Sequence, residues 1–481
     1  MDAAPRFSTI VKILLGIFLG LAVLMALRHP FNHDEFEHLH AAWNMQHGLR
    51  PYVDFFEHHH PLIWYFLLPI LWIFGETTTA VLAARFLMLG CLLVIGRQIF
   101  VLTGRIFRTP GARLFAVAFL FSNVLFVYGG VEVRPDVPQL LLILGAVLEL
   151  AAFEKDGKNG RLPAAAFLSS LAFLFLQKTV LFLFAAAVAW LWRRRDPGAP
   201  KPPARTKAAA AAAFLTPIGL FLSTLWISGA LPDYWACSWL FNLNRGSSPR
   251  PALFFLMTFA ENFLHYALGL AVFVLVVRGK WGKRIPLILP ATILVCGAAP
   301  FLLGSPYAQY FLLPVALLSV LCGGFLAEAL PRFRGRALVP IFVLFLALPP
   351  AVSFGIRAIV GNRAQIKLVG YVLRNTTPAD CVYDGRAEFN VFRRDIHYFW
   401  FMEIFGRPEE KIPSRLQARR ADFDPARLVT ELHPAFISDV GLDPSSPEIS
   451  AFYAPTKFRK PRYPANLYRR LFPPIRGNGA D

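Results

Sequence analysis

Titratable side chains are concentrated in one segment near the amino end of the chain. Residues 33–40 read His-Asp-Glu-Phe-Glu-His-Leu-His, and residues 54–61 read Asp-Phe-Phe-Glu-His-His-His-Pro. Seven of the 11 histidines lie between residues 33 and 60. Carboxylates can act as general bases or bind divalent cations, and histidine combined with carboxylate suits zinc or manganese. The segment therefore indicates acid–base chemistry, metal binding or both.

Spacing within the two clusters suggests roles for single residues. Asp34 follows the first apolar segment directly and is the candidate general base, with Glu35 as the next candidate. Asp34 and His38 are four residues apart and would share a helix face. Together with His58 they are the candidate ligands of a divalent metal (Mg, Mn or Zn). No His-Glu-x-x-His motif occurs, and a solvated polar loop is the alternative interpretation.

The first cluster is carried by a segment with helical periodicity. Polar or small residues recur on one face and apolar residues on another (Asp34, His38, Ala41 and Ala42 against Phe36, Leu39 and Trp43). This pattern predicts a short amphipathic helix that lies on a membrane surface and ends at Gly48.

The composition explains why a membrane is expected. Of the 481 residues, 56% are hydrophobic and only 16% are charged, with a mean hydropathy of +0.49. Soluble domains have about 45–50% apolar and about 25% charged residues, so a soluble globule and a disordered chain are both excluded. Twelve apolar windows follow one another: 8–27, 61–75, 79–101, 111–128, 136–153, 163–177, 179–192, 208–228, 252–277, 285–303, 308–330 and 337–356.

Charge in the connecting loops predicts the topology. Five short loops (102–113, 154–162, 193–207, 278–284 and 331–336) hold 19 Lys and Arg, whereas the intervening loops hold 6. Lys and Arg collect on the cytoplasmic side, which also explains the net charge of +19 without nucleic acid binding. With the amino terminus inside, the parity of the loops requires that window 61–75 does not cross.

We therefore expect an α-helical polytopic membrane protein with about 11 transmembrane helices and a small carboxy-terminal α/β domain outside the cytoplasm. Residues 1–356 would form the transmembrane domain, with 28–78 as one external loop. Residues 357–481 would form the soluble domain, with strands near 381–383, 397–402 and 435–440. The sequence leaves open whether Cys237 and Cys381 pair.

Lys178 interrupts the apolar run 163–192 and divides it into halves of about 15 residues, too short to span the ~30 Å hydrocarbon core. A lysine at that depth is costly unless it faces a water-filled cavity or an anion; snorkelling to the surface is the alternative. The predicted topology puts further polar groups on the same outer face (Arg134, Asp136, Tyr307, Gln309 and Tyr310). Cations and carboxylates at one membrane surface suit a substrate with a lipid tail and a phosphate.

Six motifs follow one another over roughly residues 8–330. They are the acidic pair Asp34-Glu35, the turn Gly48-Leu49-Arg50-Pro51-Tyr52-Val53-Asp54, His60-Pro61-Leu62 leading to Phe74-Gly75, Arg134-Pro135-Asp136, Gln177-Lys178-Thr179 and Pro306-Tyr307-Ala308-Gln309-Tyr310. Together they resemble the motifs of bacterial GT-C glycosyltransferases, the relatives of protein mannosyltransferases, aminoarabinose transferases and Rgt-type lipopolysaccharide core transferases. The family often has Lys-Pro-Pro or His-Pro-Pro where this chain has His60-Pro61-Leu62. The tail 357–481 has no counterpart in the resemblance.

The resemblance implies an enzyme of the bacterial inner membrane that takes a sugar from a polyprenyl-phosphate carrier on the periplasmic side. The acceptor would be a glycan, lipid or protein. Asp34 would be the base or help to hold a metal, and Lys178 and Arg134 would stabilise the leaving phosphate. The substrate-binding residues would be His60, Asp136, Tyr307, Gln309 and Tyr310. A transporter or flippase of a lipid-linked anion is the alternative, although no two similar halves occur; a metal-binding scaffold is a third.

Overall fold

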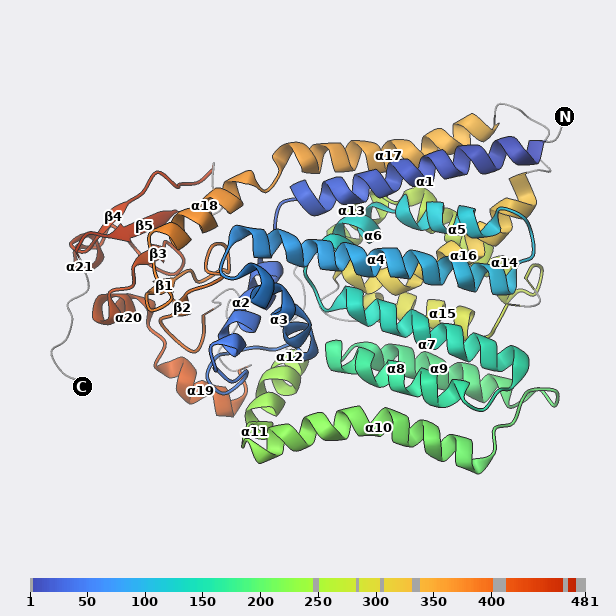
Figure 1. Ribbon diagram of the computed structural model, residues 1–481, viewed down its shortest axis with the longest axis horizontal. Helices are drawn as coiled ribbons and strands as arrows, with labels where there is room; N and C mark the ends of the chain where they lie inside the picture. The colour runs from blue at the N-terminus through green and yellow to red at the C-terminus, as the bar shows by residue number, and fades with distance from the viewer. Residues whose placement is uncertain are drawn as a thin grey trace. The chain divides into compact units, whose positions relative to one another are not determined.

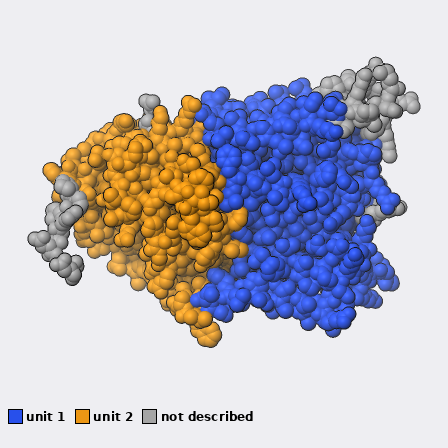
Figure 2. All heavy atoms as spheres, viewed as in Figure 1, with its two compact units in different colours: residues 1–29, 85–224, 246–360 blue, residues 30–84, 225–245, 361–481 orange. Residues whose placement is uncertain are grey.

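The computed structural model describes residues 3–244, 251–282, 285–302, 307–330, 338–400, 412–461 and 466–472. By their packing these residues divide into two compact units, coloured separately in Figure 2. The first unit comprises residues 1–29, 85–224 and 246–360. The second comprises 30–84, 225–245 and 361–481, so the long loop after the first helix packs with the carboxy-terminal segment. The predicted boundary between residues 356 and 357 stays a prediction.

The first unit is a bundle of apolar helices (Figure 1). Its elements are α1 (Ala3–Arg28), most of α4 (Thr78–Ile106), α5 (Ala112–Phe121), α6 (Val124–Val131), α7 (Asp136–Asp156), α8 (Arg161–Phe175), α9 (Thr179–Arg193), α10 (Ala204–Ile227), α13 (Pro251–Ala260), α14 (Phe263–Val277), α15 (Ile288–Leu302), the 3-10 turn η2 (Ala308–Phe311), α16 (Leu312–Ala329) and α17 (Leu338–Val360). Within the described residues, five helices are long and apolar enough to cross a membrane, or six if the bent pair α5 and α6 is one span. The protein is therefore a multi-pass membrane protein, and the count of about 11 crossings stays a prediction.

The lengths of three helices bear on that topology. Helix α3 (Leu62–Phe74) has 13 residues and contains Pro69, which gives about 20 Å of helix against a ~30 Å hydrocarbon core. Helices α8 and α9 have 15 residues each. They end and begin on either side of residues 176–178, as the sequence predicted.

The second unit contains α2 (His33–Gln46), α3 and a small sheet. Its other helical elements are α11 (Leu231–Tyr234), the π-helical turn η1 (Trp235–Leu240), α12 (Phe241–Leu243), α18 (Arg363–Arg374), α19 (Ser414–Ala421), α20 (Pro425–Leu432) and α21 (Pro447–Ser450). The strands are β1 (Cys381–Tyr383), β2 (Arg394–Asp395), β3 (Phe436–Ser438), β4 (Tyr453–Pro455) and β5 (Leu467–Arg470), in the order β2-β1-β3-β5-β4. Strand β1 is parallel to β2 and β3, whereas β5 is antiparallel to β3 and β4.

Two of the three predicted strand segments contain strands, β1 and β3. The third prediction is wrong for residues 397–400, which form no strand; residues 401–402 lie outside the described part of the chain. Aromatic side chains explain this segment's β-like composition. They pack against the long loop instead of forming a ladder: Trp400 donates a hydrogen bond to the Phe56 carbonyl at 3.0 Å, and the Tyr398 carbonyl accepts one from the Phe56 amide at 2.9 Å.

Helix α2 exists where predicted, but the structure does not support its placement on a membrane surface. Every residue from Glu35 to Asn44 is buried, on the polar face as well as the apolar face. The carboxy-terminal segment provides part of the cover. The His40 ring lies 2.6 Å from Asp395 (Nε2 to Oδ2) and 3.2 Å from the Val391 carbonyl. The polar face of α2 therefore meets protein instead of water.

All five cysteines are free, Cys237 and Cys381 included.

Candidate active site

Helix α2 begins with a capping box that separates the roles of the two predicted acids. The Asn32 side chain accepts a hydrogen bond from the Asp34 amide at 3.3 Å, and Glu35 Oε1 accepts one from the Asn32 amide at 2.9 Å. Such reciprocal bonds satisfy amides that the first turn leaves without partners. Glu35 is fully buried in this role. Asp34 instead pairs with His33 (Nε2 to Oδ1, 2.9 Å) and keeps 16% of its side chain exposed.

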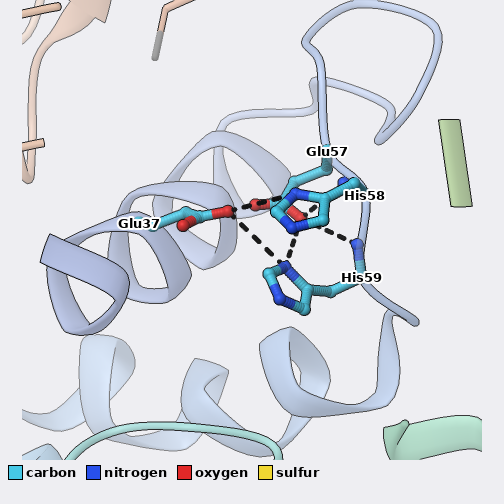
Figure 3. Close-up of side chains that lie close together, drawn as sticks. All are labelled: Glu37, Glu57, His58 and His59. Carbon is cyan, nitrogen blue, oxygen red and sulfur yellow. Dashed lines mark hydrogen bonds and ion pairs between the residues drawn. The ribbon is translucent and has the colours of Figure 1, made fainter. Parts of the chain in front are cut away.

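A second set of ionisable groups lies one turn further along α2 (Figure 3). Glu37 points from α2 toward the loop that precedes α3, which supplies Glu57, His58 and His59. Ligand-type atoms of these four residues all lie within 4.8 Å of one another. Glu37 Oε1 is 3.6 Å from His58 Nδ1 and 3.5 Å from His59 Nδ1, and Glu57 Oε2 is 3.2 Å from His59 Nδ1. We call these four residues the carboxylate–histidine cluster.

Burial sets the protonation of this cluster. Both carboxyl groups are buried, which disfavours their charged forms. Burial raises the pKa of Glu37 to about 8, with the neighbouring Glu57 charge acting in the same direction. Burial also raises the pKa of Glu57 to about 7, although the backbone amides of His58 and His59 oppose the rise by donating to Glu57 Oε2 at 3.0 and 3.2 Å. Near neutral pH the pair therefore retains a proton, which a bound cation would replace.

Hydrogen bonds from distant segments fix the loop that carries three of the four groups. The Tyr52 hydroxyl donates to the His59 carbonyl at 2.8 Å, and the Asn242 side chain donates to the His58 carbonyl at 2.8 Å. The His60 ring lies 3.1 Å from the Tyr234 hydroxyl. Tyr52 itself has a φ of +70°, a strained conformation for a non-glycine residue. Segments far apart in sequence thus hold the loop in one conformation.

The donor set fits a divalent metal in its chemistry. Two imidazoles and two carboxylates are ligands that zinc and manganese accept, whereas magnesium prefers oxygen alone. Of the three ligands predicted from the sequence, only His58 belongs to the cluster. The ring of His38 packs edge-on against that of His59, with centroids 4.7 Å apart. Glu37, Glu57 and His59 were not predicted from the sequence as candidate ligands, although the run Glu57-His58-His59 contained a usable signal.

In the first unit, Lys178 sits at the start of α9 as its N-cap residue. Its ammonium group forms an ion pair with Asp136, the first residue of α7, and lies 4.2 Å from the centre of the Tyr310 ring. Gln309 and Tyr310 line the same small cavity of about 40 Å³, together with Asp136 and Lys178. The structure therefore brings together four of the residues that the sequence predicted for phosphate or substrate binding.

The remaining predicted residues have other contacts or belong to the other unit. Arg134 joins the ion-pair network through Asp136 (Nε to Oδ2, 3.7 Å) and also pairs with Glu132 at 3.5 Å. Tyr307 contacts Tyr310, with ring centres 5.8 Å apart. His60 belongs to the second unit. Glu132, which the sequence analysis did not select, also faces His29 at 3.4 Å. The cations of this network thus already have carboxylate partners.

Comparisons with known proteins agree with this architecture. Residues 58–219 match the family described as dolichyl-phosphate-mannose-protein mannosyltransferase. No curated protein matches the chain in sequence.

Among solved structures, ArnT from Cupriavidus metallidurans bound to undecaprenyl phosphate is 14% identical, with a TM-score of 0.57 over 93% of this chain and 82% of that chain. The oligosaccharyltransferase AglB from Archaeoglobus fulgidus, in complex with an inhibitory peptide and a dolichol-phosphate, is 14% identical, with a TM-score of 0.51 over 97% and 75%. The Archaeoglobus fulgidus oligosaccharyltransferase in complex with Zn and sulfate is 14% identical, with a TM-score of 0.51 over 95% and 73%. The chain therefore has the fold of the GT-C membrane glycosyltransferases, and the family match within it supports a glycosyltransferase, as the sequence resemblance predicted.

Proposed function

We propose that the protein transfers a sugar from a polyprenyl-phosphate carrier to a hydroxyl or amide group of a glycan, lipid or protein acceptor. The observation that carries the proposal is the cation at the break between α8 and α9. Lys178 is held by Asp136 and Tyr310 at a cavity that Gln309 also lines. A lipid-linked phosphate is the anion that a cavity within membrane-spanning helices would meet. The structural neighbours bound to undecaprenyl phosphate and dolichol-phosphate support this choice.

In the proposed reaction, the acceptor oxygen or nitrogen attacks the anomeric carbon of the donor sugar. The bond between that carbon and the phosphate oxygen breaks, and polyprenyl phosphate leaves with the bonding electrons. Asp34 takes the proton of the acceptor, since it is the partly exposed acid of the first turn of α2. Lys178 and Arg134 offset the charge that develops on the phosphate, while Asp136, Gln309, Tyr310, Tyr307 and His60 contribute substrate contacts.

We further propose that a divalent metal binds in the second unit, held by the carboxylate–histidine cluster. A bound cation would supply electrostatic stabilisation of negative charge. The set Asp34, His38 and His58, inferred from helical spacing, is the competing assignment. Zinc binding to single variants separates the two: Glu37→Gln should weaken binding if the cluster is the site, whereas His38→Gln should do so if the spacing-based set is.

The activity test is direct. Purified protein incubated with a radiolabelled polyprenyl-phosphate sugar should release the sugar onto an acceptor or water and accumulate polyprenyl phosphate. A carrier-flipping protein would move the labelled lipid between leaflets of a vesicle without cleaving it. Intact donor after prolonged incubation across a panel of sugars and acceptors, with transbilayer movement observed, would contradict the proposal.

The proposed topology has the amino terminus inside the cytoplasm and the second unit's carboxy-terminal segment in the periplasm of a bacterial inner membrane. The short length of α3 supports the exclusion of window 61–75 from the crossings. Reporter fusions at Gly104 and Gly157 should both read cytoplasmic. A periplasmic signal at Gly104 would mean that α3 crosses and that the parity is wrong.

A further inference from the structure

A pocket of about 280 Å³ lies at the end of α9, far from Lys178 along that helix. It is formed by the last turn of α9, the loop that follows and the first turn of α10. Its lining residues are Trp190, Arg193, Arg194, Asp196, Ala199, Pro200, Lys201, Pro202 and Lys207. Four of these nine side chains are cationic and one is acidic. The proposed reaction uses none of them.

The pocket has a defined shape, because Arg193 and the loop after α9 are held against neighbouring segments of the first unit. Arg193 pairs with Glu154 of α7 (Nη1 to Oε2, 2.9 Å) and donates to the Glu154 carbonyl. The loop turns around Asp196, whose side chain accepts a hydrogen bond from the Gly198 amide at 2.9 Å. A side chain at Gly157 would meet Pro200 at 3.2 Å, which shows how closely the loop packs on the α7–α8 turn. Prolines at 200, 202 and 203 further restrict the loop.

The positive charge of the pocket is not balanced by the acidic residues that line it. Arg193 is neutralised by Glu154, but Arg194, Lys201 and Lys207 form no ion pair with any residue that the structure describes. Asp196 is the only acid among the lining residues. Three cations against one carboxylate leave a net attraction for an anion. The first turn of α10 adds the positive end of a 24-residue helix.

The surroundings indicate that the anion belongs to a lipid. Helix α10 begins at the pocket, and no residue of its apolar window is buried in the structure, so α10 presents its apolar surface to the bilayer. Trp192, next to the pocket, is 63% exposed, as expected for an indole at a membrane–water boundary. One lipid could therefore place its headgroup in the pocket and its acyl chains against α10.

We propose that this pocket binds the headgroup phosphate of an anionic glycerophospholipid, such as phosphatidylglycerol. Arg194, Lys201 and Lys207 contact the phosphate, and Trp190 and Trp192 flank the glycerol region. Basic pockets at the ends of membrane helices recognise such headgroups. The site is distinct from the donor-phosphate site in its residues and its end of α9, and it does not depend on the proposed reaction.

Native mass spectrometry of the full-length protein, titrated with phosphatidylglycerol or phosphatidylcholine, tests the proposal. The pocket variant is Arg194→Gln/Lys207→Gln. The matched control is Arg195→Gln/Arg205→Gln, which removes the same charge from the same segment at residues that do not line the pocket. We expect the dissociation constant for phosphatidylglycerol to rise about 10- to 30-fold in the pocket variant, as two cations near a membrane surface would predict, and less than about twofold in the control.

Each other result overturns the proposal. Equal weakening in both variants would show a diffuse effect of surface charge. Unchanged binding in the pocket variant, or equal binding of phosphatidylcholine to the parent protein, would show that the pocket selects no anionic lipid. Displacement of phosphatidylglycerol by millimolar inorganic phosphate would assign the pocket to a soluble anion. Thermal melting of both variants checks that each is folded.

Discussion

Buried charge is neutralised differently in the carboxylate–histidine cluster of the second unit and in the ion-pair network of Lys178, Asp136 and Arg134 in the first unit. In the cluster, Glu37 and Glu57 are buried side by side, and their raised pKa values show that the fold favours a proton there. In the network, Lys178 and Asp136 are both charged partners of one ion pair. The first arrangement gains from an added cation. The second is already neutral, so any phosphate must compete with Asp136.

Because of this difference, removal of an acidic side chain should change ligand binding in opposite directions at the two sites. Removing an acid from the cluster removes a ligand and weakens binding of a cation. Removing the acid from the Lys178 pair frees a cation and strengthens binding of an anion.

The largest effect is expected for Asp34→Asn. General-base catalysis contributes about 10²- to 10⁴-fold, so turnover should fall by that factor while donor affinity is largely kept. The matched control is Glu35→Gln. Glutamine can replace glutamate in a capping box, so this variant should keep near-normal turnover and melting temperature. Steady-state kinetics with a radiolabelled donor measures both. If Glu35→Gln were the inactive variant, the roles of the two acids would be exchanged.

The next effect concerns the cluster. Glu57→Gln should weaken zinc binding by more than the 10- to 100-fold that loss of an outer hydrogen-bond partner of a metal site typically costs, because it removes a proposed ligand. His33→Gln, outside the cluster but on the helix that carries Glu37, should change zinc affinity little. Competition with a chelating dye gives both constants. Equal affinities for the parent protein and Glu57→Gln would rule out the cluster as the metal site.

Local sequence patterns predicted the helices and strands that depend mainly on neighbouring residues in the chain. The Gln177-Lys178-Thr179 break separated α8 from α9, and the run Cys381-Val382-Tyr383 became β1. The burial of α2 could not be predicted in this way. His40 and Asp395 are 355 residues apart in sequence, and nothing in the helical pattern of α2 shows that its polar face will be covered. The membrane-surface interpretation of α2 was therefore reasonable for an isolated helix and wrong for the folded chain.

The candidate sites show the same limit. The predicted topology placed residues 177–179 and 306–310 together, and Lys178, Gln309 and Tyr310 do line one cavity. Residue 306 lies outside the described residues, and the outer face stays a prediction. The metal ligands were predicted mainly from one helical spacing, that of Asp34 and His38. The cluster instead combines Glu37 of α2 with three residues of the loop before α3. Glu37 joins it from α2, while Tyr52 and Asn242 donate hydrogen bonds to the carbonyls of the loop that carries the other three groups. Such a convergence is a tertiary property, and the sequence could supply only its residue types.

The third prediction addresses the cation of the first unit. Lys178→Ala should weaken binding of both the sugar donor and polyprenyl phosphate by about 10- to 100-fold, the range expected for loss of a hydrogen bond to a charged group. Lys178→Arg should be only partly tolerated, because a planar guanidinium does not replace a compact ammonium group. Binding of fluorescent polyprenyl phosphate to protein in detergent provides the measurement. Unchanged binding by Lys178→Ala would make Lys178 a structural partner of Asp136 and Tyr310 only.

The smallest effect is the most specific to the comparison. Asp136→Asn keeps the shape of the side chain at the start of α7 but removes the negative charge that pairs with Lys178. A phosphate would then no longer compete with a carboxylate, and polyprenyl phosphate should bind about fivefold more tightly, as expected for one charge interaction of about 1 kcal/mol near a membrane surface. Glu149→Gln, which removes an acid in the carboxy-terminal half of α7, is the control and should leave binding unchanged. The same titration used for Lys178→Ala measures the change. Weaker binding in Asp136→Asn would show that Asp136 orients Lys178 for the phosphate instead of competing with it, and the contrast between the two sites would fail.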